Sequence, residues 1–200
     1  IVLTIDNTVQ SMVEDNLSQL LKKWSAPSGT IMIQDPNSGA IIAMASSPSF
    51  DPNFYNQYPL GRFINPATQE MFEPGSTFKV ITMSAGIDTG KVMPSTTYED
   101  KGIVAIGGYT IKNFDEKAHG VNTMIQVLEK SLNTGAVFVQ GLLGNDNFLN
   151  YVVNFGFGKK TNIDLAGEIR GDISNLYSGR HINFATASFG QGISVTTLQL

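Results

Sequence analysis

A serine and a lysine three residues apart carry the strongest chemical signal in the sequence. Ser76 and Lys79 follow the dipeptide Pro74-Gly75, and apolar residues at helical spacing come after them, so we expect the pair in the first turn of a helix. Residues i and i+3 of a helix share one face, which brings the hydroxyl beside the amine. A lysine can take the proton of a serine nucleophile when burial lowers its pKa. The pair therefore indicates acyl transfer through a serine.

The same residues also fit an ordinary helix start, in which the serine caps the helix and the lysine is solvated. The helix N-terminus would assist catalysis, because its free amides and positive dipole end would stabilise an oxyanion at the carbonyl under attack, but these residues taken alone favour the ordinary helix start. The choice between the two interpretations depends on the rest of the sequence.

Four segments in order resemble one known family. The segment from Glu73 to Lys79, Glu-Pro-Gly-Ser-Thr-Phe-Lys, resembles the S-x-x-K active-site motif of penicillin-binding proteins. Ser131-Leu132-Asn133 is similar to the family's second box, S-x-N, although helix capping would also explain both polar residues. Residues 3–10 resemble the opening of the family's transpeptidase module. Phe189-Gly190-Gln191-Gly192 resembles the module's glycine-rich stretch.

The resemblance implies a set of roles. Ser76 would be the nucleophile, Lys79 its base and Ser131 a proton relay. Substrate-binding residues would be Asn133, Gly190, Gln191 and Gly192. The implied reaction is cross-linking of peptidoglycan stem peptides by a D,D-transpeptidase, without metal or organic cofactor. β-Lactam antibiotics would inhibit it by binding covalently to Ser76.

The sequence also indicates which subgroup of the family the chain resembles. Glu73-Pro74-Gly75 and the opening pattern Thr4-x-Asp6-x-x-x-Gln10 resemble class B, monofunctional enzymes. The alternatives are a serine β-lactamase or a D,D-carboxypeptidase on the same scaffold, or a non-catalytic penicillin sensor. Ser131-x-Asn133 argues against class D enzymes and sensors, and Leu132 against class A. A deacylating base would distinguish the hydrolases, and the candidates Glu73, Asp115 and Glu116 stay open.

The composition of the chain argues against several classes of partner and site. The chain has 200 residues, 42% of them hydrophobic, and a net charge of −4, which argues against nucleic acid. It has no cysteine and two histidines, too few for thiolate chemistry or an imidazole zinc site. No apolar stretch reaches the roughly 18–20 residues that span a bilayer. The resemblance places an anchor outside this chain, at the extracytoplasmic face of a bacterial membrane, with division or elongation proteins as candidate partners.

The predicted elements indicate an α+β fold, and the resemblance implies one partial transpeptidase domain over residues 1–200 with a β-lactamase/transpeptidase-like architecture. We expect an antiparallel sheet packed with a helical subdomain. The patterns predict a strand over 1–5, a helix from Asp6 to a buried Trp24, hairpins over 29–45 and 103–111, a long loop over 46–66 and short helices over 122–155. The family's Lys-Thr-Gly strand would follow residue 200. We therefore expect the C-terminal strands to be missing, both ends to be artificial, and the 200 residues alone to be inactive.

Overall fold

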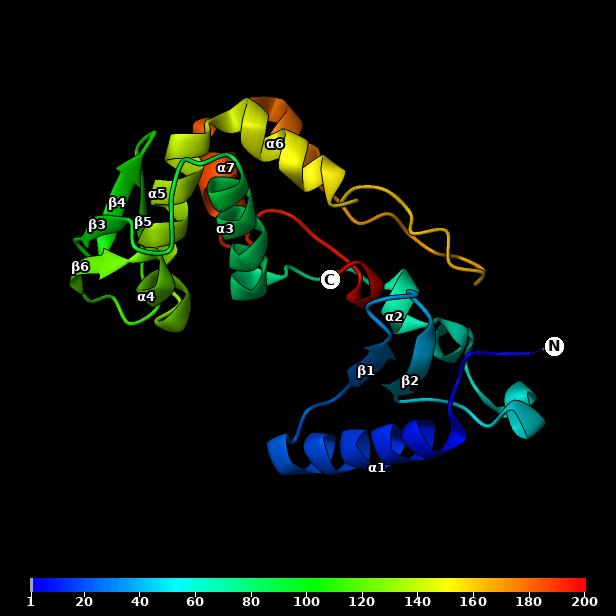
Figure 1. Ribbon diagram of the computed structural model, residues 1–200. Helices are drawn as coiled ribbons and strands as arrows, with labels where there is room; N and C mark the ends of the chain where they lie inside the picture. The colour runs from blue at the N-terminus through cyan, green and yellow to red at the C-terminus, as the bar shows by residue number, and fades with distance from the viewer. Residues whose placement is uncertain (1) are drawn as a thin grey trace. The chain divides into compact units, whose positions relative to one another are not determined.

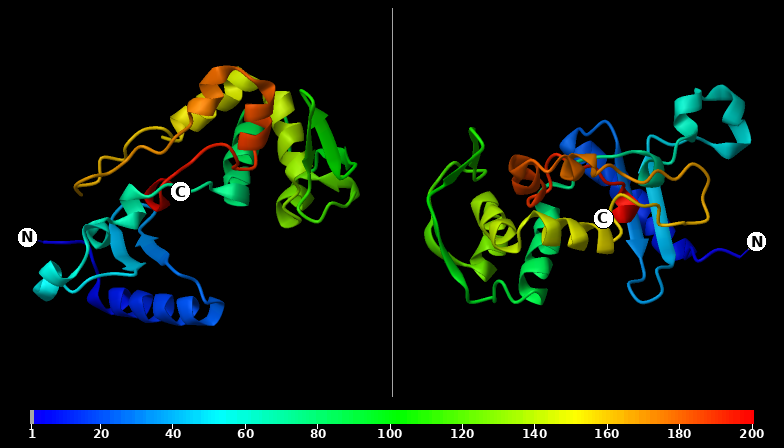
Figure 2. Two further views of the ribbon diagram at one scale, coloured as in Figure 1. Left: turned by 180° about the vertical axis from the view of Figure 1, so that it is seen from behind. Right: turned by 90° about the horizontal axis from the view of Figure 1, so that it is seen from above.

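The computed structural model describes residues 2–200, and the chain divides into two compact units (Figures 1 and 2). The first unit contains the chain up to Met71 together with residues 162–169 and 196–200. The second unit contains residues 72–161 and 170–195. Helices and antiparallel strand pairs occur together, so the predicted α+β class is confirmed.

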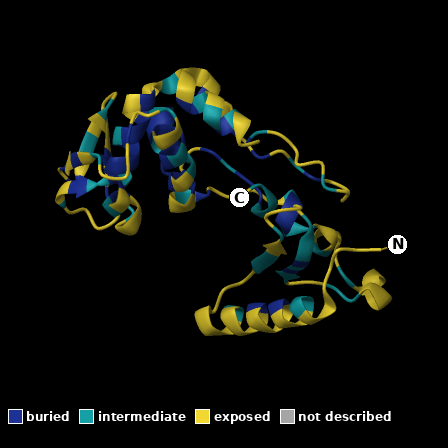
Figure 3. Ribbon diagram, viewed as in Figure 1, coloured by how far each residue is buried: buried dark blue, intermediate teal, exposed yellow. Residues whose placement is uncertain are grey.

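The first unit is a helix packed on a hairpin. Helix α1 (Asn7–Trp24) lies along the antiparallel pair of β1 (Gly29–Gln34) and β2 (Ile41–Ser47), as predicted (Figure 1). The helix begins where the Asp6 side chain accepts a hydrogen bond from the amide of Val9 at 2.9 Å. Its buried stripe, visible in Figure 3, packs on alanines of β2, and the buried members of this cluster are Val13, Leu17, Ala43 and Ala45.

The predicted strand at the N-terminus is wrong for Val2–Ile5, and Ile1 lies outside the described residues. Side chains take the place of a strand at the edge of β2. The Thr4 hydroxyl donates to the carbonyl of Ile41 at 2.6 Å. The amide group of Gln10 bonds both the N–H and the C=O of Met44, at 2.9 and 3.0 Å. These bonds satisfy backbone groups that an open edge would leave unpaired.

The prediction of a buried Trp24 is also wrong, because its side chain is 70% exposed. The hairpin supports α1 only as far as Leu21. A Cβ on Gly29, the first residue of β1, would lie 3.1 Å from Leu17 and 3.2 Å from Leu21. The last turn of the helix therefore extends past the sheet, and Trp24 lies under the amine of Lys23 at 5.3 Å.

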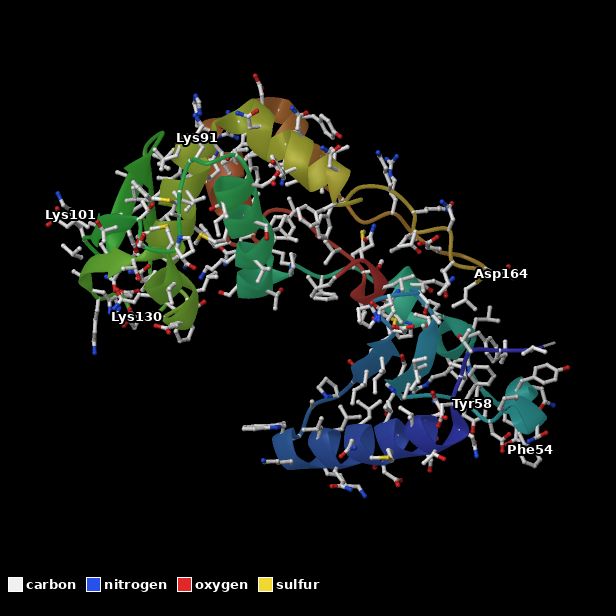
Figure 4. The ribbon with its side chains drawn as sticks, viewed as in Figure 1. Phe54, Tyr58, Lys91, Lys101, Lys130 and Asp164 are labelled. Atoms are coloured by element: carbon white, nitrogen blue, oxygen red, sulfur yellow. The ribbon has the colours of Figure 1, made fainter. Side chains whose placement is uncertain are left out.

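The predicted loop over 46–66 is confirmed as an irregular connection. It holds two 3₁₀ turns, Pro52–Gln57 and Leu60–Phe63, and leads into the short helix α2 (Pro66–Gln69). The ring of Phe50 packs edge-to-face against Phe63 at 4.8 Å and against Tyr58 at 6.1 Å, and Tyr58 is marked in Figure 4. At the other end of the chain, Thr197–Gln199 forms a 3₁₀ turn.

The second unit is mainly helical. Its helices are α3 (Lys79–Asp88), α4 (Met124–Glu129), α5 (Asn133–Leu143), α6 (Asn145–Asn154) and α7 (His181–Ala187), preceded or joined by 3₁₀ turns at Gly75–Phe78 and Ser174–Ser178. Two small antiparallel pairs flank them: β3 (Thr97–Asp100) with β6 (Gly120–Thr123), and β4 (Ile103–Ile106) with β5 (Tyr109–Lys112). The predicted second hairpin and the helices over 122–155 are thus confirmed.

Helix α5 is the centre of the second unit, and its neighbours include α3, α4, α6 and α7. Most of its residues are buried in the core, as the dark colour in Figure 3 shows. Glycines allow the helices to approach closely: a Cβ on Gly86 of α3 would lie 2.6 Å from Val139 of α5. A Cβ on Gly135 of α5 would likewise meet Val127 of α4 at 2.5 Å. This packing holds the beginnings of α3 and α5 beside each other.

Candidate active site

Ser76 and Lys79 lie in one tight turn, as predicted. Gly75–Phe78 is a 3₁₀ turn that continues directly into α3, and residues three apart are eclipsed in such a turn. The Lys79 amine donates to the Ser76 hydroxyl at 3.1 Å. Ser76 is exposed, whereas Lys79 is only 2% exposed. An exposed hydroxyl thus lies beside a buried amine.

Ser131 completes a three-residue cluster. The Lys79 amine also donates to the hydroxyl of Ser131 at 3.0 Å and to its carbonyl oxygen at 2.5 Å. Ser131 lies between α4 and α5 with φ of 54°, a left-handed conformation that few residues other than glycine adopt. A strained residue of this kind persists only where the surrounding structure holds it, and such residues cluster at functional sites.

Burial sets the protonation of the lysine. All three oxygen atoms that the Lys79 amine contacts are neutral, so none of them compensates for the loss of water around the charged form. Desolvation lowers the pKa of Lys79 from 10.5 to about 8. Near neutral pH a useful fraction of this amine is therefore deprotonated and able to accept a proton from Ser76.

Asn133 lies at the start of α5, beside a groove of the second unit. Its side-chain N–H donates to the carbonyl of Lys112 in β5 at 2.9 Å, which leaves the side-chain oxygen for another partner. The groove measures about 500 Å³, and its lining includes Asn133 and Gln191 together with Arg180. Two of the four predicted substrate-binding residues thus face one cavity.

The other two, Gly190 and Gly192, contact the backbone segment that precedes Ser76. The amide of Gly75 donates to the carbonyl of Gly190 at 3.0 Å. The amide of Gly192 donates to the carboxylate of Glu73 at 2.7 Å. A bridge between Phe72 and Val195 continues this pairing. The glycine-rich stretch therefore supports the backbone that leads into Ser76.

The three carboxylates left open as deacylating bases each have a partner. Glu73 accepts the amide of Gly192, as described above. Asp115 bonds the ring of His119 at 3.0 Å, and Glu116 pairs with Lys112 at 3.0 Å. Over residues 2–200, no group of three or more His, Asp or Glu side chains could hold a metal ion.

Sequence reasoning missed a buried polar cluster beneath the Ser131–Asn133 turn. Its members are Asp100, Asn113 and Thr134, all at most 6% exposed. Asp100 lies in the charged stretch Glu99-Asp100-Lys101, which is typical of an exposed turn, so local sequence gave no signal of its burial. The adjacency of Thr134 to Asn133 was the one available sign.

Comparison with known proteins identifies the family. The family model named penicillin binding protein transpeptidase domain matches residues 29–200. Stage V sporulation protein D of Bacillus subtilis is 36% identical over 200 residues, which cover 98% of this chain and 31% of that protein. The peptidoglycan D,D-transpeptidase FtsI of Escherichia coli is 33% identical over 198 residues, with 99% and 33% covered. The chain thus spans about a third of the length of these relatives.

A solved structure agrees with the sequence relatives. The crystal structure of penicillin binding protein 3 from Mycobacterium tuberculosis, complexed with aztreonam, has 31% sequence identity and a TM-score of 0.92. The match covers 100% of this chain and 45% of that one. Since the family model spans most of the sequence and the fold matches closely, this chain belongs to the penicillin-binding protein transpeptidase domain family.

Proposed function

We propose that this chain carries the reaction centre of a class B peptidoglycan D,D-transpeptidase that works through a serine acyl-enzyme. The observation that supports this most strongly is the buried Lys79 amine, held 3.1 Å from the Ser76 hydroxyl and 3.0 Å from that of Ser131. Its pKa, lowered to about 8, suits a general base. A relative named as a peptidoglycan D,D-transpeptidase supports the choice of substrate.

The acylation step follows from this geometry. Neutral Lys79 takes the proton of Ser76 as Oγ attacks the carbonyl carbon of the penultimate D-alanine of a stem peptide. The peptide C–N bond then breaks, and the leaving amine of the terminal D-alanine receives a proton from the Ser131 hydroxyl. Ser131 is reprotonated by Lys79, which returns to its neutral form, and an ester at Ser76 remains.

The second half of the reaction reverses the proton path. The amine of a neighbouring stem peptide attacks the ester carbonyl, loses a proton towards Ser131 and Lys79, and forms the cross-link. The ester C–O bond breaks, and Ser76 recovers its proton. Asn133, with its free side-chain oxygen, would bind an amide N–H of the substrate in the groove that Gln191 also lines.

β-Lactam antibiotics would acylate the same serine. Attack of Ser76 on the lactam carbonyl breaks the ring C–N bond, and the amine that leaves stays attached to the adduct. The adduct therefore keeps the acceptor amine away from the ester. The related M. tuberculosis protein was solved with aztreonam and with ampicillin, which supports this inhibition.

The location and partners are further parts of the proposal. We place the catalytic unit at the extracytoplasmic face of a bacterial membrane, anchored through a segment outside these residues, where division or elongation proteins would be its partners. The names of the relatives, a sporulation protein and FtsI, support a role in cell-wall assembly. Within residues 2–200, no helix has the length and apolarity to cross a bilayer.

Labelling of the full-length protein with a fluorescent penicillin, followed by tandem mass spectrometry, tests the proposal. We expect one stable adduct, on Ser76, which a Ser76→Ala variant loses while staying folded. An adduct on another residue, or none on the folded wild type, would contradict the assignment. An adduct on Ser76 that disappears within seconds would favour a β-lactamase or carboxypeptidase instead.

A further inference from the structure

Asp100 is a buried carboxylate outside the three-residue cluster of Ser76, Lys79 and Ser131. It ends strand β3 and is only 2% exposed. One oxygen accepts from the amide of Gly102 at 2.8 Å and from the hydroxyl of Thr134 at 2.7 Å. The other accepts from the side-chain N–H of Asn113 at 2.8 Å and from the amide of His119 at 3.1 Å. Four donors fill the acceptor positions of the carboxylate.

These four donors are neutral. The adjacent Lys101, marked in Figure 4, extends away from the unit and pairs with Glu99 at 3.7 Å. Its side chain is 72% exposed. A buried charge held by neutral hydrogen bonds is expensive to desolvate, so its retention calls for a structural or functional reason.

The buried polar cluster of Asp100, Asn113 and Thr134 is joined directly to the Ser131–Asn133 turn. Asn113, which Asp100 holds, accepts the backbone amide of Thr134 at 3.2 Å through its side-chain oxygen. The residue before it, Lys112, accepts the side-chain N–H of Asn133 at 2.9 Å. The first two residues of α5 are therefore both bound to residues 112–113, and Asp100 bonds both Asn113 and Thr134.

The turn needs such support because its backbone is strained. Ser131 has φ of 54°, and a left-handed residue of this kind persists only where its surroundings fix it from both sides. On the upstream side, the amides of Ser131 and Leu132 donate to carbonyls of α4, at 3.1 and 2.9 Å. On the downstream side, the attachment is through Thr134 to Asn113 and Asp100.

We propose that Asp100 is a positioning residue for the reaction: through Thr134 and Asn113 it fixes the turn that presents Ser131 to Lys79 and Asn133 to the groove. This inference rests on the proposed function, because it assigns Asp100 a part in acylation. Among residues 2–200, the hydrogen bonds of the Asp100 carboxylate go to Gly102, Asn113, His119 and Thr134, and none goes to Ser76, Lys79 or Ser131. Its effect is on where the Ser131 hydroxyl and the Asn133 side chain lie.

An Asp100→Asn substitution in the full-length protein tests this. Asparagine keeps the shape of the side chain, but its NH₂ group faces donors where the carboxylate accepted two hydrogen bonds. We expect the second-order rate of Ser76 acylation by a fluorescent penicillin to fall at least about ten-fold, because small displacements of catalytic groups slow reactions steeply. The rate is measured per folded molecule, below the onset of thermal unfolding of every variant.

Two controls separate positioning from simple loss of stability. Val152→Ala removes volume from the buried face of α6 and should lower the melting temperature while keeping the wild-type acylation rate. Thr134→Val removes the hydroxyl that bonds Asp100 and should slow acylation, whereas Thr134→Ser keeps the hydroxyl and should restore it. Rescue by serine is a result that a general packing role for Thr134 does not predict.

The outcomes are distinct. Asp100→Asn acylating at the wild-type rate per folded molecule would overturn the positioning role, as would Thr134→Val and Thr134→Ser behaving alike. If the folded wild type and Val152→Ala both fail to label at Ser76, the proposed function itself fails, and this result is recognisable without reference to Asp100.

Discussion

The backbone of Gly190 lies directly against that of Gly75, the residue before Ser76. The Gly75 amide donates to the Gly190 carbonyl at 3.0 Å. A Cβ on Gly190 would lie 2.1 Å from the carbonyl oxygen of Gly75 and 2.6 Å from its nitrogen. No side chain larger than hydrogen fits there. The position of Ser76 therefore depends on a glycine more than a hundred residues later in the chain.

We expect Gly190→Ala to reduce acylation of Ser76 by roughly 100-fold, because the new methyl group displaces the turn that holds the nucleophile. The rate with a fluorescent penicillin measures this. Gly144→Ala is a matched control, since Gly144 also has a positive φ, 76°, yet its Cβ would meet no atom within 4 Å. Similar losses in both variants would attribute the effect to backbone strain and refute the role of the close contact.

The lowered pKa of Lys79 predicts how the acylation rate depends on pH. As the proposed base, Lys79 is active when neutral, and its pKa is lowered to about 8, so the neutral fraction grows as the pH rises through 8. The acylation rate should therefore increase from pH 6 to 9 and level off above that range, as stopped-flow fluorescence would record. Lys79→Ala should lose most of the activity and this rise. A rate that falls with increasing pH would exclude Lys79 as the general base.

The local part of the site could be predicted from sequence. Ser76 and Lys79 are three residues apart in one turn, so their contact follows from helical geometry. Ser131 is 52 residues beyond Lys79, and its contact depends on the packing of α3 against α5. Only the resemblance to a known family connected the two segments.

Some features could not be predicted from the sequence because they depend on tertiary contacts. Asp100 is surrounded by charged neighbours in the chain, and its burial depends on Thr134 in α5. The packing of Gly190 against the backbone of Gly75 was not predicted, and it leaves the expected substrate-binding role of Gly190 a prediction. Trp24 was expected in the core, but the hairpin beneath α1 is too short to cover it. For Asp100 and Gly190 the deciding neighbour is distant in sequence, where local patterns carry no information.

Two substitutions of Ser131 should separate the effect of its left-handed backbone on stability from the effect of its hydroxyl on acylation. Ser131→Ala and Ser131→Gly both remove the hydroxyl proposed as the proton relay, so both should slow acylation strongly. Glycine tolerates φ of 54°, whereas alanine does not, so Ser131→Gly should be more stable by roughly 0.5–1 kcal/mol. Urea unfolding of the full-length variants measures this difference. Equal stability of the two would mean that the left-handed conformation is not strained in the protein.

Two glycines inside helices should respond to alanine in opposite directions. A Cβ on Gly86 of α3 would clash with Val139 at 2.6 Å and with Val92 at 2.9 Å, so Gly86→Ala should destabilise the fold by about 1–3 kcal/mol. Gly141 of α5 has no atom within 4 Å of such a Cβ, so Gly141→Ala should stabilise it by about 0.5–1 kcal/mol through helix propensity.

Thermal and urea unfolding measure both changes in stability. The separation of α3 and α5 also fixes the distance from Lys79 to Ser131, so Gly86→Ala should slow acylation per folded molecule as well. Gly141→Ala should leave the rate unchanged. If Gly86→Ala were less stable but acylated normally, the close approach of the two helices would matter for the core and not for the site.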